Sequence, residues 1–363
     1  MTTIQPIARL LAVILIAAMV LVAIPSPVHG QGGPPPSARL DGIRLTPQLW
    51  NNCGPANLTQ ALSYFGWGYD QTRAANYLKP DPEDKNVSPG QMAAFVNQQT
   101  EMPTLRALWR YGGTLDLIKR LIAAGFPVII ESGFDVEDLG WMGHYETVIA
   151  YDDASQTIWH FDTYLVDESG SMGIARPYSE FDYWWRHFNR AFIVIFPVDR
   201  ENEIRDILGS YVDPKYAAEQ ALIVARQEAT EDPNDSWAWF NAGTSSAKLG
   251  RYHDAAIYFD EAFRLGMPYR VTWYQFGAYE AYFNLGRFED VLTLANNTAA
   301  TTLYVEETNY WRGMAYAGLG RFDEAVVQFD EALAFNRNFL EAQTAKDQVQ
   351  NGTFAAAAPV PSQ

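Results

Sequence analysis

The sequence predicts two folded units, an α+β domain followed by an all-α domain of repeated helix pairs. Residues from about Leu40 to Asp199 mix strand-like and helix-like hydrophobic patterns, whereas the chain after Tyr211 shows helical spacing alone. A short phrase that contains a glycine also recurs three times in the second part. With 363 residues, 48% of them hydrophobic, the chain is long enough to bury more than one core. We therefore expect one domain over residues 41–199 and another over 211–350.

The first 30 residues have the pattern of a secretory signal. Arg9 precedes an apolar run over residues 10–24, and residues 25–30 supply small side chains suited to cleavage. We therefore expect residues 1–30 to be a signal peptide and the folded part to be exported, extracellular or tethered to the outer face of the membrane. The apolar run is shorter than the roughly 20 residues of a spanning helix, so a retained N-terminal anchor is the second choice. Residues 31–40, rich in Gly and Pro, are a predicted linker.

The chain is acidic, with a formal net charge of −17. Nucleic-acid binding draws on clustered Lys and Arg, so we expect no nucleic acid among its partners. No cluster of His, Cys, Asp and Glu has metal-ligand spacing in the sequence, and no glycine-rich phosphate loop is present. The sequence therefore predicts neither a cofactor nor a metal ion.

The second part contains an internal repeat. The phrase Leu-Gly-Arg followed by an aromatic residue occurs at residues 249–252, 285–288 and 319–322, so its glycines are 36 and then 34 residues apart. A turn glycine between two helices at this period resembles the tetratricopeptide (TPR) repeat. Packing positions of the first repeat return in the third: Gly243, Tyr252, Ala255, Phe259 and Ala262 recur as Gly313, Phe322, Ala325, Phe329 and Ala332. The resemblance implies a superhelix whose groove recruits a protein partner. An array that only spaces or stabilises the first domain is the alternative.

The repeats differ in detail. The middle one has Val291, Ala295 and Thr298 where Ala, an aromatic residue and Ala are expected, so we expect its second helix to pack less well. Residues 215–229, ahead of the first repeat, resemble the second helix of an incomplete one. The low-complexity end, residues 351–363, is a predicted disordered tail.

Cys53 is the only cysteine of the chain, so no intramolecular disulfide can form. The apolar residues after it fall on one helical face: Leu58, Ala61, Leu62 and Phe65. Pro55 suits a first helical turn, which puts Cys53 at or just before a helix N-terminus. The positive end of a helix favours the thiolate, the attacking form of cysteine. A buried structural cysteine is the alternative.

A thiolate nucleophile needs a base that carries its proton to the leaving amine, and imidazole has a suitable pKa. His144 opens the strand-like run of residues 145–151, and a second run, residues 157–161, leads to Asp162. In an antiparallel hairpin His144 and Asp162 would lie side by side. The carboxylate could then hydrogen-bond the imidazole and fix its tautomer.

Cys-Gly-Pro-Ala at a helix start, Gly-His-Tyr at the start of a strand and Asp after the next strand resemble the C39-like branch of the papain-type cysteine peptidases, over roughly residues 41–199. The resemblance implies a papain-like α+β domain in which Cys53 attacks a peptide carbonyl, His144 is general base and acid, and Asp162 orients it. In that family a glutamine upstream of the cysteine supplies an oxyanion-hole donor, and Gln48 is the matching residue. It lies five residues before Cys53, one fewer than in the papain-like pattern.

The sequence thus predicts an exported thiol peptidase that cleaves a peptide or isopeptide bond in a peptide or protein substrate. Two alternatives remain. One is a non-catalytic scaffold that holds peptides without cutting them. The other is a cell-wall amidase or transpeptidase that uses the same triad, because an acyl-enzyme accepts different acceptors.

Other polar residues have plainer interpretations. His160 lies on the second predicted strand of the hairpin and is expected in the core or in a supporting role. His187 belongs to an aromatic cluster and is expected to pack there. Asp152 and Asp153 compete for the role of orienting carboxylate, but they are expected to form the hairpin turn. Residues 80–90, rich in Pro and acidic side chains, are predicted to be a solvated loop, and a loop that borders the cleft is the alternative.

Overall fold

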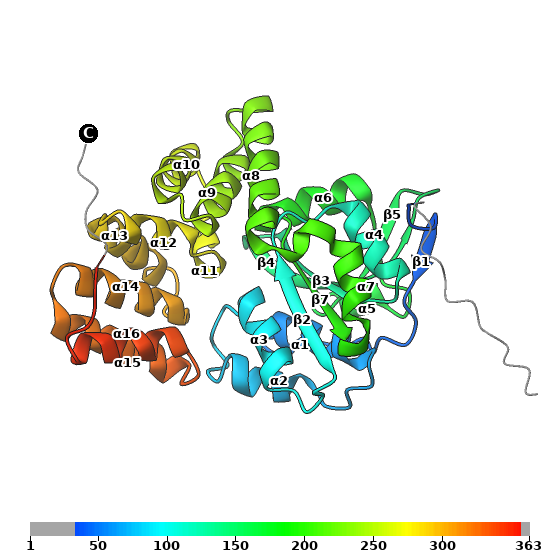
Figure 1. Ribbon diagram of the computed structural model, residues 1–363, viewed down its shortest axis with the longest axis horizontal. Coiled ribbons are helices and arrows are strands. Elements are labelled where there is room, and N and C mark those ends of the chain that lie inside the picture. The colour runs from blue at the N-terminus through cyan, green and yellow to red at the C-terminus, as the bar shows by residue number, and fades with distance from the viewer. Residues whose placement is uncertain (1–32, 357–363) are drawn as a thin grey trace, which may run out of the picture. The chain divides into compact units, whose positions relative to one another are not determined.

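The computed structural model describes residues 33–356. The predicted signal segment, residues 1–30, and residues 357–363 of the predicted tail lie outside this range. An antiparallel sheet with helices forms the N-terminal part, and paired helices form the C-terminal part (Figure 1). The predicted fold class, an α+β domain followed by an all-α repeat array, is confirmed. In the described part of the chain, no helix combines the length and the apolar character needed to cross a membrane.

One sheet of seven strands organises the first domain. Its strands pair antiparallel in the order β2-β7-β3-β4-β5-β6, and β1 pairs with β4. The strands are β1 Ser37–Arg39, β2 Leu105–Arg110, β3 Val128–Val136, β4 Gly140–Asp152, β5 Thr157–Asp162, β6 Ile174–Pro177 and β7 Phe192–Pro197. The long strand β4 lies between β3 and β5, so side chains near its start are held by neighbours on both sides.

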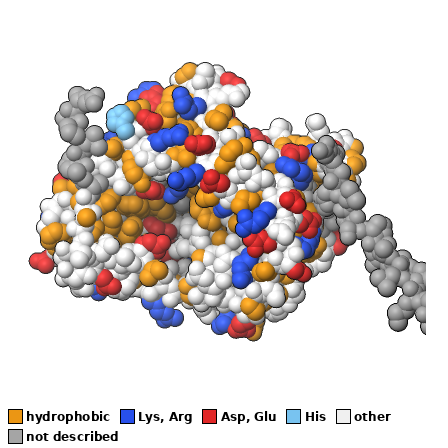
Figure 2. Space-filling model, viewed as in Figure 1, with side chains coloured by type: hydrophobic (Ala, Val, Ile, Leu, Met, Phe, Trp, Pro, Cys, Tyr) orange, Lys and Arg blue, Asp and Glu red, His pale blue; other side chains and the backbone are white. Residues whose placement is uncertain are grey.

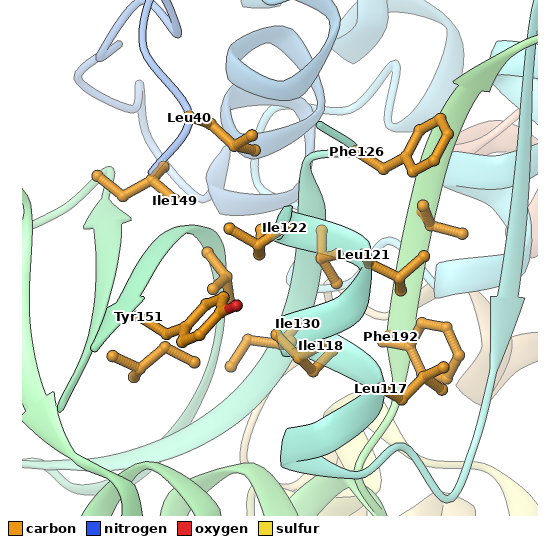
Figure 3. Packing of buried hydrophobic residues seen from close by; sticks show 14 of the residues in the cluster. Leu40, Leu117, Ile118, Leu121, Ile122, Phe126, Ile130, Ile149, Tyr151 and Phe192 are labelled. Carbon is orange, nitrogen blue, oxygen red and sulfur yellow. The ribbon is translucent and has the colours of Figure 1, made fainter. Parts of the chain in front are cut away.

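Helices cover both faces of this sheet. On β3, Val128 and Ile130 belong to one hydrophobic cluster and Ile129 to another, because successive strand residues point to opposite faces. Figure 3 shows the first cluster, where Leu121 of α4 and Phe192 of β7 are among the buried residues. Helices α4, α6 and α7 contribute to it, and α1, α2 and α3 to the other. The helices are α1 Cys53–Ser63, α2 Gln71–Leu78, α3 Pro89–Gln98, α4 Leu115–Ala123, α5 Val166–Ser169, α6 Tyr178–Trp185 and α7 Glu201–Leu208.

The folded domain extends past both of its predicted limits. Strand β1 lies inside the predicted linker of residues 31–40 and pairs with β4, and Leu40 is buried in the first cluster. The linker interpretation is therefore wrong for its last residues, because the chain beyond the prolines joins β4 as an extra strand. At the other end, Ile204 and Leu208 of α7 are buried in the same cluster, beyond residue 199.

Nine helices of the described chain form the C-terminal array: α8 Pro214–Glu231, α9 Ser236–Lys248, α10 Tyr252–Leu265, α11 Val271–Tyr274, α12 Gly277–Asn284, α13 Phe288–Ala299, α14 Glu306–Gly318, α15 Phe322–Phe335 and α16 Leu340–Gln350. The three repeat glycines, Gly250, Gly286 and Gly320, have φ of 72°, 72° and 74°. Only glycine adopts this left-handed conformation freely, which explains its return at each inter-helix turn. Beyond α16, Phe354 packs against Phe283, with ring centroids 6.5 Å apart.

The second helix of the middle repeat is well packed, contrary to expectation. Val291 and Ala295 are fully buried, and Thr298 is 1% exposed. The Thr298 hydroxyl lies 2.8 Å from the Tyr279 hydroxyl and 2.7 Å from that of Thr272. A buried hydroxyl that is hydrogen-bonded costs little, so the polar residue is accommodated where an apolar one was expected.

The repeat array packs on the first domain through aromatic side chains. Trp141 of β4 and Phe188 belong to the same hydrophobic cluster as residues of α9 to α13. Trp237 of α9 stacks on His187, with ring centroids 4.2 Å apart and planes 9° apart. Gln275, between α11 and α12, donates a hydrogen bond to the His187 carbonyl oxygen at 2.9 Å. This interface brings α11 next to the start of β4.

The loop of residues 80–90 is largely buried, so the prediction of a solvated loop is wrong. Asp84 is 0% exposed and Asn86 is 5% exposed. Helix α14 meets the loop, and Asn86 Nδ2 donates to Glu307 Oε1 at 2.7 Å. The polar side chains that suggested solvent exposure instead contact polar groups of the repeat array.

Candidate active site

Cys53 is the first residue of α1 and is half-buried. The preceding Asn52 occupies the N-cap position, but its side chain makes no capping hydrogen bond. The first amides of a helix have no acceptor within the helix, so they and the helix dipole present partial positive charge here. The helix start therefore favours a thiolate at Cys53, as the sequence predicted.

The segment before Cys53 is held by Gln71 of α2. The Gln71 side chain is buried, and its Nε2 donates to the Pro47 carbonyl oxygen at 2.6 Å. Its Oε1 accepts from the Leu49 amide at 2.8 Å and from Asn52 Nδ2 at 3.0 Å. One side chain thus fixes the approach to the helix start. Sequence reasoning missed it, because nothing in the local pattern connects Gln71 to this segment.

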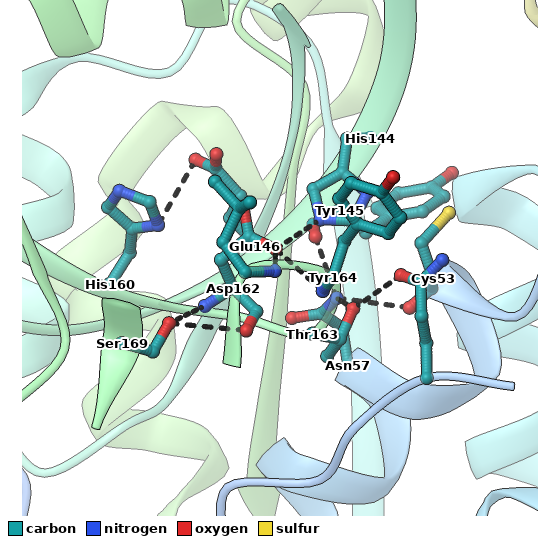
Figure 4. A network of polar contacts seen from close by, with 12 residues as sticks. Cys53, Asn57, His144, Tyr145, Glu146, His160, Asp162, Thr163, Tyr164 and Ser169 are labelled. Carbon is teal, nitrogen blue, oxygen red and sulfur yellow. Dashed lines mark hydrogen bonds and ion pairs between the residues drawn. The ribbon is translucent and has the colours of Figure 1, made fainter. Parts of the chain in front are cut away.

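His144 and Asp162 come from neighbouring strands of the predicted hairpin. Glu146 lies directly opposite Asp162 in the register of β4 and β5, and His144 is two residues earlier on the same face. His144 Nε2 and Asp162 Oδ1 are 3.0 Å apart, and both side chains are buried (Figure 4). The same oxygen accepts from the amides of Tyr164 and Leu165 at 2.7 and 2.9 Å. These bonds hold the carboxylate in place for the ring.

His144 lies beside Cys53 and interacts with its thiol, which changes the pKa of both groups. Burial raises the pKa of the Cys53 thiol, but hydrogen bonding and the charge of His144 lower it, so that the pKa lies below its ordinary value. The backbone amides of Tyr145 and Gly54 contribute to this lowering. Since Asp162 engages Nε2 of the ring, Nδ1 is the nitrogen left for the sulfur.

Burial disfavours a charge on His144 and so lowers its pKa. The charge and hydrogen bonding of Asp162 and of Cys53 raise the pKa, and their combined effect is larger than that of burial. The pKa of His144 therefore lies well above the ordinary 6.5. Burial raises the pKa of Asp162, but the charge of His144 and its hydrogen bond lower that pKa by more. The pKa of Asp162 therefore lies well below 3.8. A lowered thiol pKa beside a raised imidazole pKa favours the thiolate-imidazolium pair.

Gln48 lies on the same cleft as Cys53 and His144. Its Oε1 accepts a hydrogen bond from Thr163 Oγ1 at 2.8 Å, and its backbone amide donates to the Thr163 carbonyl oxygen at 2.8 Å. Because the carbonyl end of the side chain is occupied, the amide end is the one available to a substrate oxygen. Thr163 follows Asp162 directly, and its part in holding Gln48 was not predicted.

Asn57, one helical turn after Cys53, connects the helix to the sheet. It is fully buried, and its Nδ2 donates to the Cys53 carbonyl oxygen at 3.0 Å and to the Tyr145 carbonyl oxygen at 2.7 Å. Figure 4 shows these contacts beside the sulfur. A signal for this residue existed, because Asn57 and Gln60 are amides within an otherwise apolar helix face. Buried amides of this kind need partners, and here the partners surround the site.

The other candidates lie in supporting or separate positions. His160 is 0% exposed and 3.5 Å from Glu146, and burial lowers its pKa to about 4, so it is neutral near pH 7. Asp153 pairs with Lys119 at 2.8 Å in the hairpin turn. His187 stacks in the interface, and burial lowers its pKa to about 3. None of the three lies on the cleft that contains Cys53.

The cleft in front of the sulfur has a volume of about 340 Å³. Several of its lining side chains are large, apolar and solvent-exposed: Leu49, Trp50, Leu139 and Tyr164. Such a lining suits an extended peptide with apolar side chains. Tyr274 of α11 also lines it, so the repeat array contributes directly to the cleft. Nothing in the sequence pattern of the repeats indicated this.

The arrangement of these residues is suited to acyl transfer. Within residues 33–356, no group of three or more His, Cys, Asp and Glu side chains is arranged to hold a metal ion. A thiol at a helix N-terminus, a histidine beside it and a carboxylate that orients the ring can act as nucleophile, base and orienting group. On an antiparallel α+β scaffold, this arrangement is typical of papain-like cysteine peptidases.

Comparison with protein families identifies the two parts. Residues 40–191 match the Peptidase_C39 like family, and residues 306–339 match the tetratricopeptide repeat. The chain therefore contains a C39-like peptidase domain followed by a TPR region, as the sequence resemblance predicted. No curated protein matches the chain.

Solved structures with similar parts are distant. A structure described as a C39-like peptidase from Bacillus anthracis is 16% identical, with a TM-score of 0.35, and the match covers 44% of this chain and 97% of that one. Residues 41 to the end of MamA from Desulfovibrio magneticus RS-1 are 17% identical, with a TM-score of 0.33, and cover 38% of this chain and 77% of that one. A MamA RS-1 double mutant has 17% identity and a TM-score of 0.34, over 42% of this chain and 85% of that one.

Proposed function

We propose that the chain is an exported thiol peptidase that cleaves a peptide or isopeptide bond and recruits a protein through its repeats. The observation that carries the proposal is the arrangement of three residues: Cys53 and His144 line the same apolar cleft, and His144 Nε2 lies 3.0 Å from Asp162 Oδ1. Export rests on the apolar segment at residues 10–24.

The reaction begins from the Cys53 thiolate. Its sulfur forms a bond to the substrate carbonyl carbon, and the carbonyl π electrons move onto oxygen, where the Cys53 amide and Gln48 Nε2 stabilise the charge. The C–N bond breaks, and the leaving amine takes a proton from the His144 imidazolium. Water then attacks the thioester while His144 accepts its proton, which releases the acid and regenerates the thiolate. Asp162 keeps the ring oriented and stabilises its positive charge.

The test is the pH dependence of Cys53 alkylation. Iodoacetamide reacts with the thiolate, and because the chain has one cysteine, mass spectrometry assigns every adduct. The wild type, His144→Ala and His253→Ala are compared between about pH 4 and pH 9, a range that brackets the ordinary thiol pKa. His253 is an exposed residue of the repeat array and serves as the matched control.

We expect rapid alkylation of the wild type and of His253→Ala well below the ordinary thiol pKa, and loss of this low-pH reactivity in His144→Ala. A wild-type profile that rises only near pH 8.5 would contradict the proposal, because it would mean that His144 does not activate the thiol. In that case the non-catalytic peptide scaffold would be the better account.

A further inference from the structure

A second cavity, of about 250 Å³, lies between the peptidase domain and the repeat array. The peptidase domain supplies one wall, from the start of α3, the end of β2 and the middle of β3. The repeat array supplies the other, from α9, α11, α12, α14 and the start of α16. Figure 2 shows a hollow on this face of the molecule, with hydrophobic and acidic side chains at its edge. The cavity is therefore built jointly by the two domains.

Aromatic rings from both domains line this cavity. Trp109 and Tyr111 come from the β2 side, and their ring centroids are 5.1 Å apart. Tyr310 and Trp311 come from α14, and their centroids are also 5.1 Å apart. Phe339, before α16, also lines the cavity. Rings that face a cavity from several sides suit a cation, because the face of each ring carries partial negative charge.

The ionisable groups of the cavity are mostly acidic. Glu131, Glu280, Glu307 and Glu341 line it, and Lys248 is the basic residue of the lining. Lys248 already pairs with Glu280 at 2.9 Å. The remaining three carboxyl groups therefore have no basic residue of the lining beside them. The cavity combines an excess of acid with aromatic walls.

Glu307 is the group best prepared for a ligand. It is 7% exposed, and its Oε1 is fixed by Asn86 Nδ2 at 2.7 Å. Its Oε2 is buried and has no hydrogen-bond partner among the described residues. A buried oxygen without a partner costs free energy, which a bound donor would recover. Burial also raises the pKa of Glu307 to about 8, so an arriving ammonium group would displace its proton.

The cavity adjoins the small pocket that contains Cys53. Glu131 and Tyr274 line it, and both also line the small pocket that contains Cys53 and His144. Tyr274 borders the main cleft as well. A peptide that lies in the cleft with its scissile bond at Cys53 therefore has this cavity within reach of a side chain a few residues away.

We propose that this joint cavity is a specificity subsite that binds a lysine or arginine side chain of the substrate peptide. The inference rests on the proposed peptidase function. The cationic head would contact Glu307 and lie among the rings of Trp109, Tyr310 and Trp311, with Glu341 at the exposed end. The repeat array would then select the substrate as part of the catalytic cleft, in addition to any recruitment through its other surfaces.

The test uses pairs of epoxysuccinyl peptides that alkylate Cys53 and differ in one position, lysine in one and norleucine in the other. Norleucine has nearly the same length without the charge. The position is moved along both sides of the epoxide, because the polarity of the bound peptide is an outcome of the experiment. For each pair, the ratio of the second-order rate constants is measured in the full wild-type chain, which cancels the intrinsic reactivity of the thiol.

At one position we expect the lysine probe to react about tenfold faster, the size of a partly desolvated cation–aromatic contact. Glu307→Gln removes the carboxylate but keeps an oxygen that accepts from Asn86. Glu341→Gln removes a carboxylate at an exposed position, where folding is not at risk. In both variants the ratio should fall towards one. Glu331→Gln, on the exposed surface of α15, is the matched control and should leave the ratio unchanged.

A ratio near one at every position, or a preference that survives both cavity variants, would overturn the subsite. A failure of the proposed function is read separately, from iodoacetamide alkylation of the same samples. If the thiol proves unactivated, fluorescein-labelled lysine and norleucine peptides without the epoxide are titrated into the Cys53→Ala chain and followed by anisotropy. Tighter binding of the lysine peptide by about tenfold supports the subsite, and equal binding rejects it.

Discussion

The charge on the Cys53 sulfur depends on groups from three elements. The start of α1 supplies amides and the helix dipole, β4 supplies His144, and β5 supplies Asp162. Each group acts over a short distance, so the lowered pKa of Cys53 exists only when the hairpin and the helix are docked. The reactivity of this single thiol is thus a sensitive measure of the local structure.

Asp162→Asn tests the orienting carboxylate. The change removes the charge that raises the pKa of His144, so the imidazolium and with it the thiolate become less stable. We expect Cys53 alkylation near pH 6 to slow about tenfold, which corresponds to one pKa unit, and the pH profile to move upwards. Asp153→Asn, the same change in the hairpin turn, should leave the profile in place. Equal profiles for the two variants would remove Asp162 from the mechanism.

At the residue scale, the candidate catalytic residues could be predicted from the sequence, whereas the side chains that hold them could not. The chain order of Gln48, Cys53, His144 and Asp162 and the hairpin pattern indicated these residues, and the structure brings all four to one cleft region. The residues that hold them, such as Gln71 and Thr163, were not predicted. A supporting side chain only needs the right distance in space, and that distance has no fixed spacing along the sequence.

Helix α14 and the buried loop of residues 80–90 meet through carboxyl groups. Asp84, Glu306 and Glu307 are all buried there, and Asn336 Nδ2 donates to Glu306 Oε1 at 2.9 Å. Burial raises the pKa of Asp84 to about 6 and that of Glu307 to about 8, and it raises the pKa of Glu306 well above 4.5. The folded state therefore holds protons that the unfolded chain releases above about pH 4.5.

This contact predicts a pH-dependent interface. Groups whose folded pKa is raised stabilise the fold fully below their unfolded pKa, and this contribution is lost as the pH rises through the folded pKa. As the pH rises from 5 to 8, the free energy of unfolding of the double variant Glu306→Gln/Glu307→Gln should therefore increase relative to that of wild type, by about 2 kcal/mol. Urea unfolding at both pH values measures the difference, and the comparison with wild type cancels the effects of the buried histidines, which both proteins share.

Glu289→Gln/Glu331→Gln, a matched double change at exposed positions of the array, serves as the control and should not gain stability with pH. If the variant and the wild type differ by the same amount at both pH values, the carboxyl groups at this contact do not change their protonation on unfolding. The interface would then be insensitive to pH in this range.

At the scale of the whole molecule, the peptidase domain and the repeats share one hydrophobic cluster, so we expect them to unfold together. Trp237 is the clearest link, because it stacks on His187 and contacts Trp141 with ring centroids 5.1 Å apart. Trp239, two residues later, contacts Tyr258 within the array. The two tryptophans therefore allow an interface contact and an internal contact to be compared.

Trp237→Ala should destabilise the peptidase domain as well as the repeats, because it removes a large side chain between them. We expect a loss of about 3 kcal/mol, and the low-pH alkylation of Cys53, which requires the docked His144, should be lost at the same urea concentration as helical circular dichroism. Trp239→Ala should lower the stability without exposing the interface. Loss of helical signal in Trp237→Ala while Cys53 keeps its low-pH reactivity would show that the domains unfold independently.

The sequence by itself determined the two fold classes, the repeat period, and the positions of Cys53, His144 and Asp162. These properties depend on local spacing: hydrophobic periodicity, a glycine that must adopt positive φ, and a hairpin that places two strand ends together. Only the tertiary structure decided that β1 joins the sheet, that the loop of residues 80–90 is buried, and that Tyr274 borders the cleft. Each of these depends on a contact between segments distant in sequence, and a polar or aromatic side chain looks the same in sequence whether it faces water or another domain.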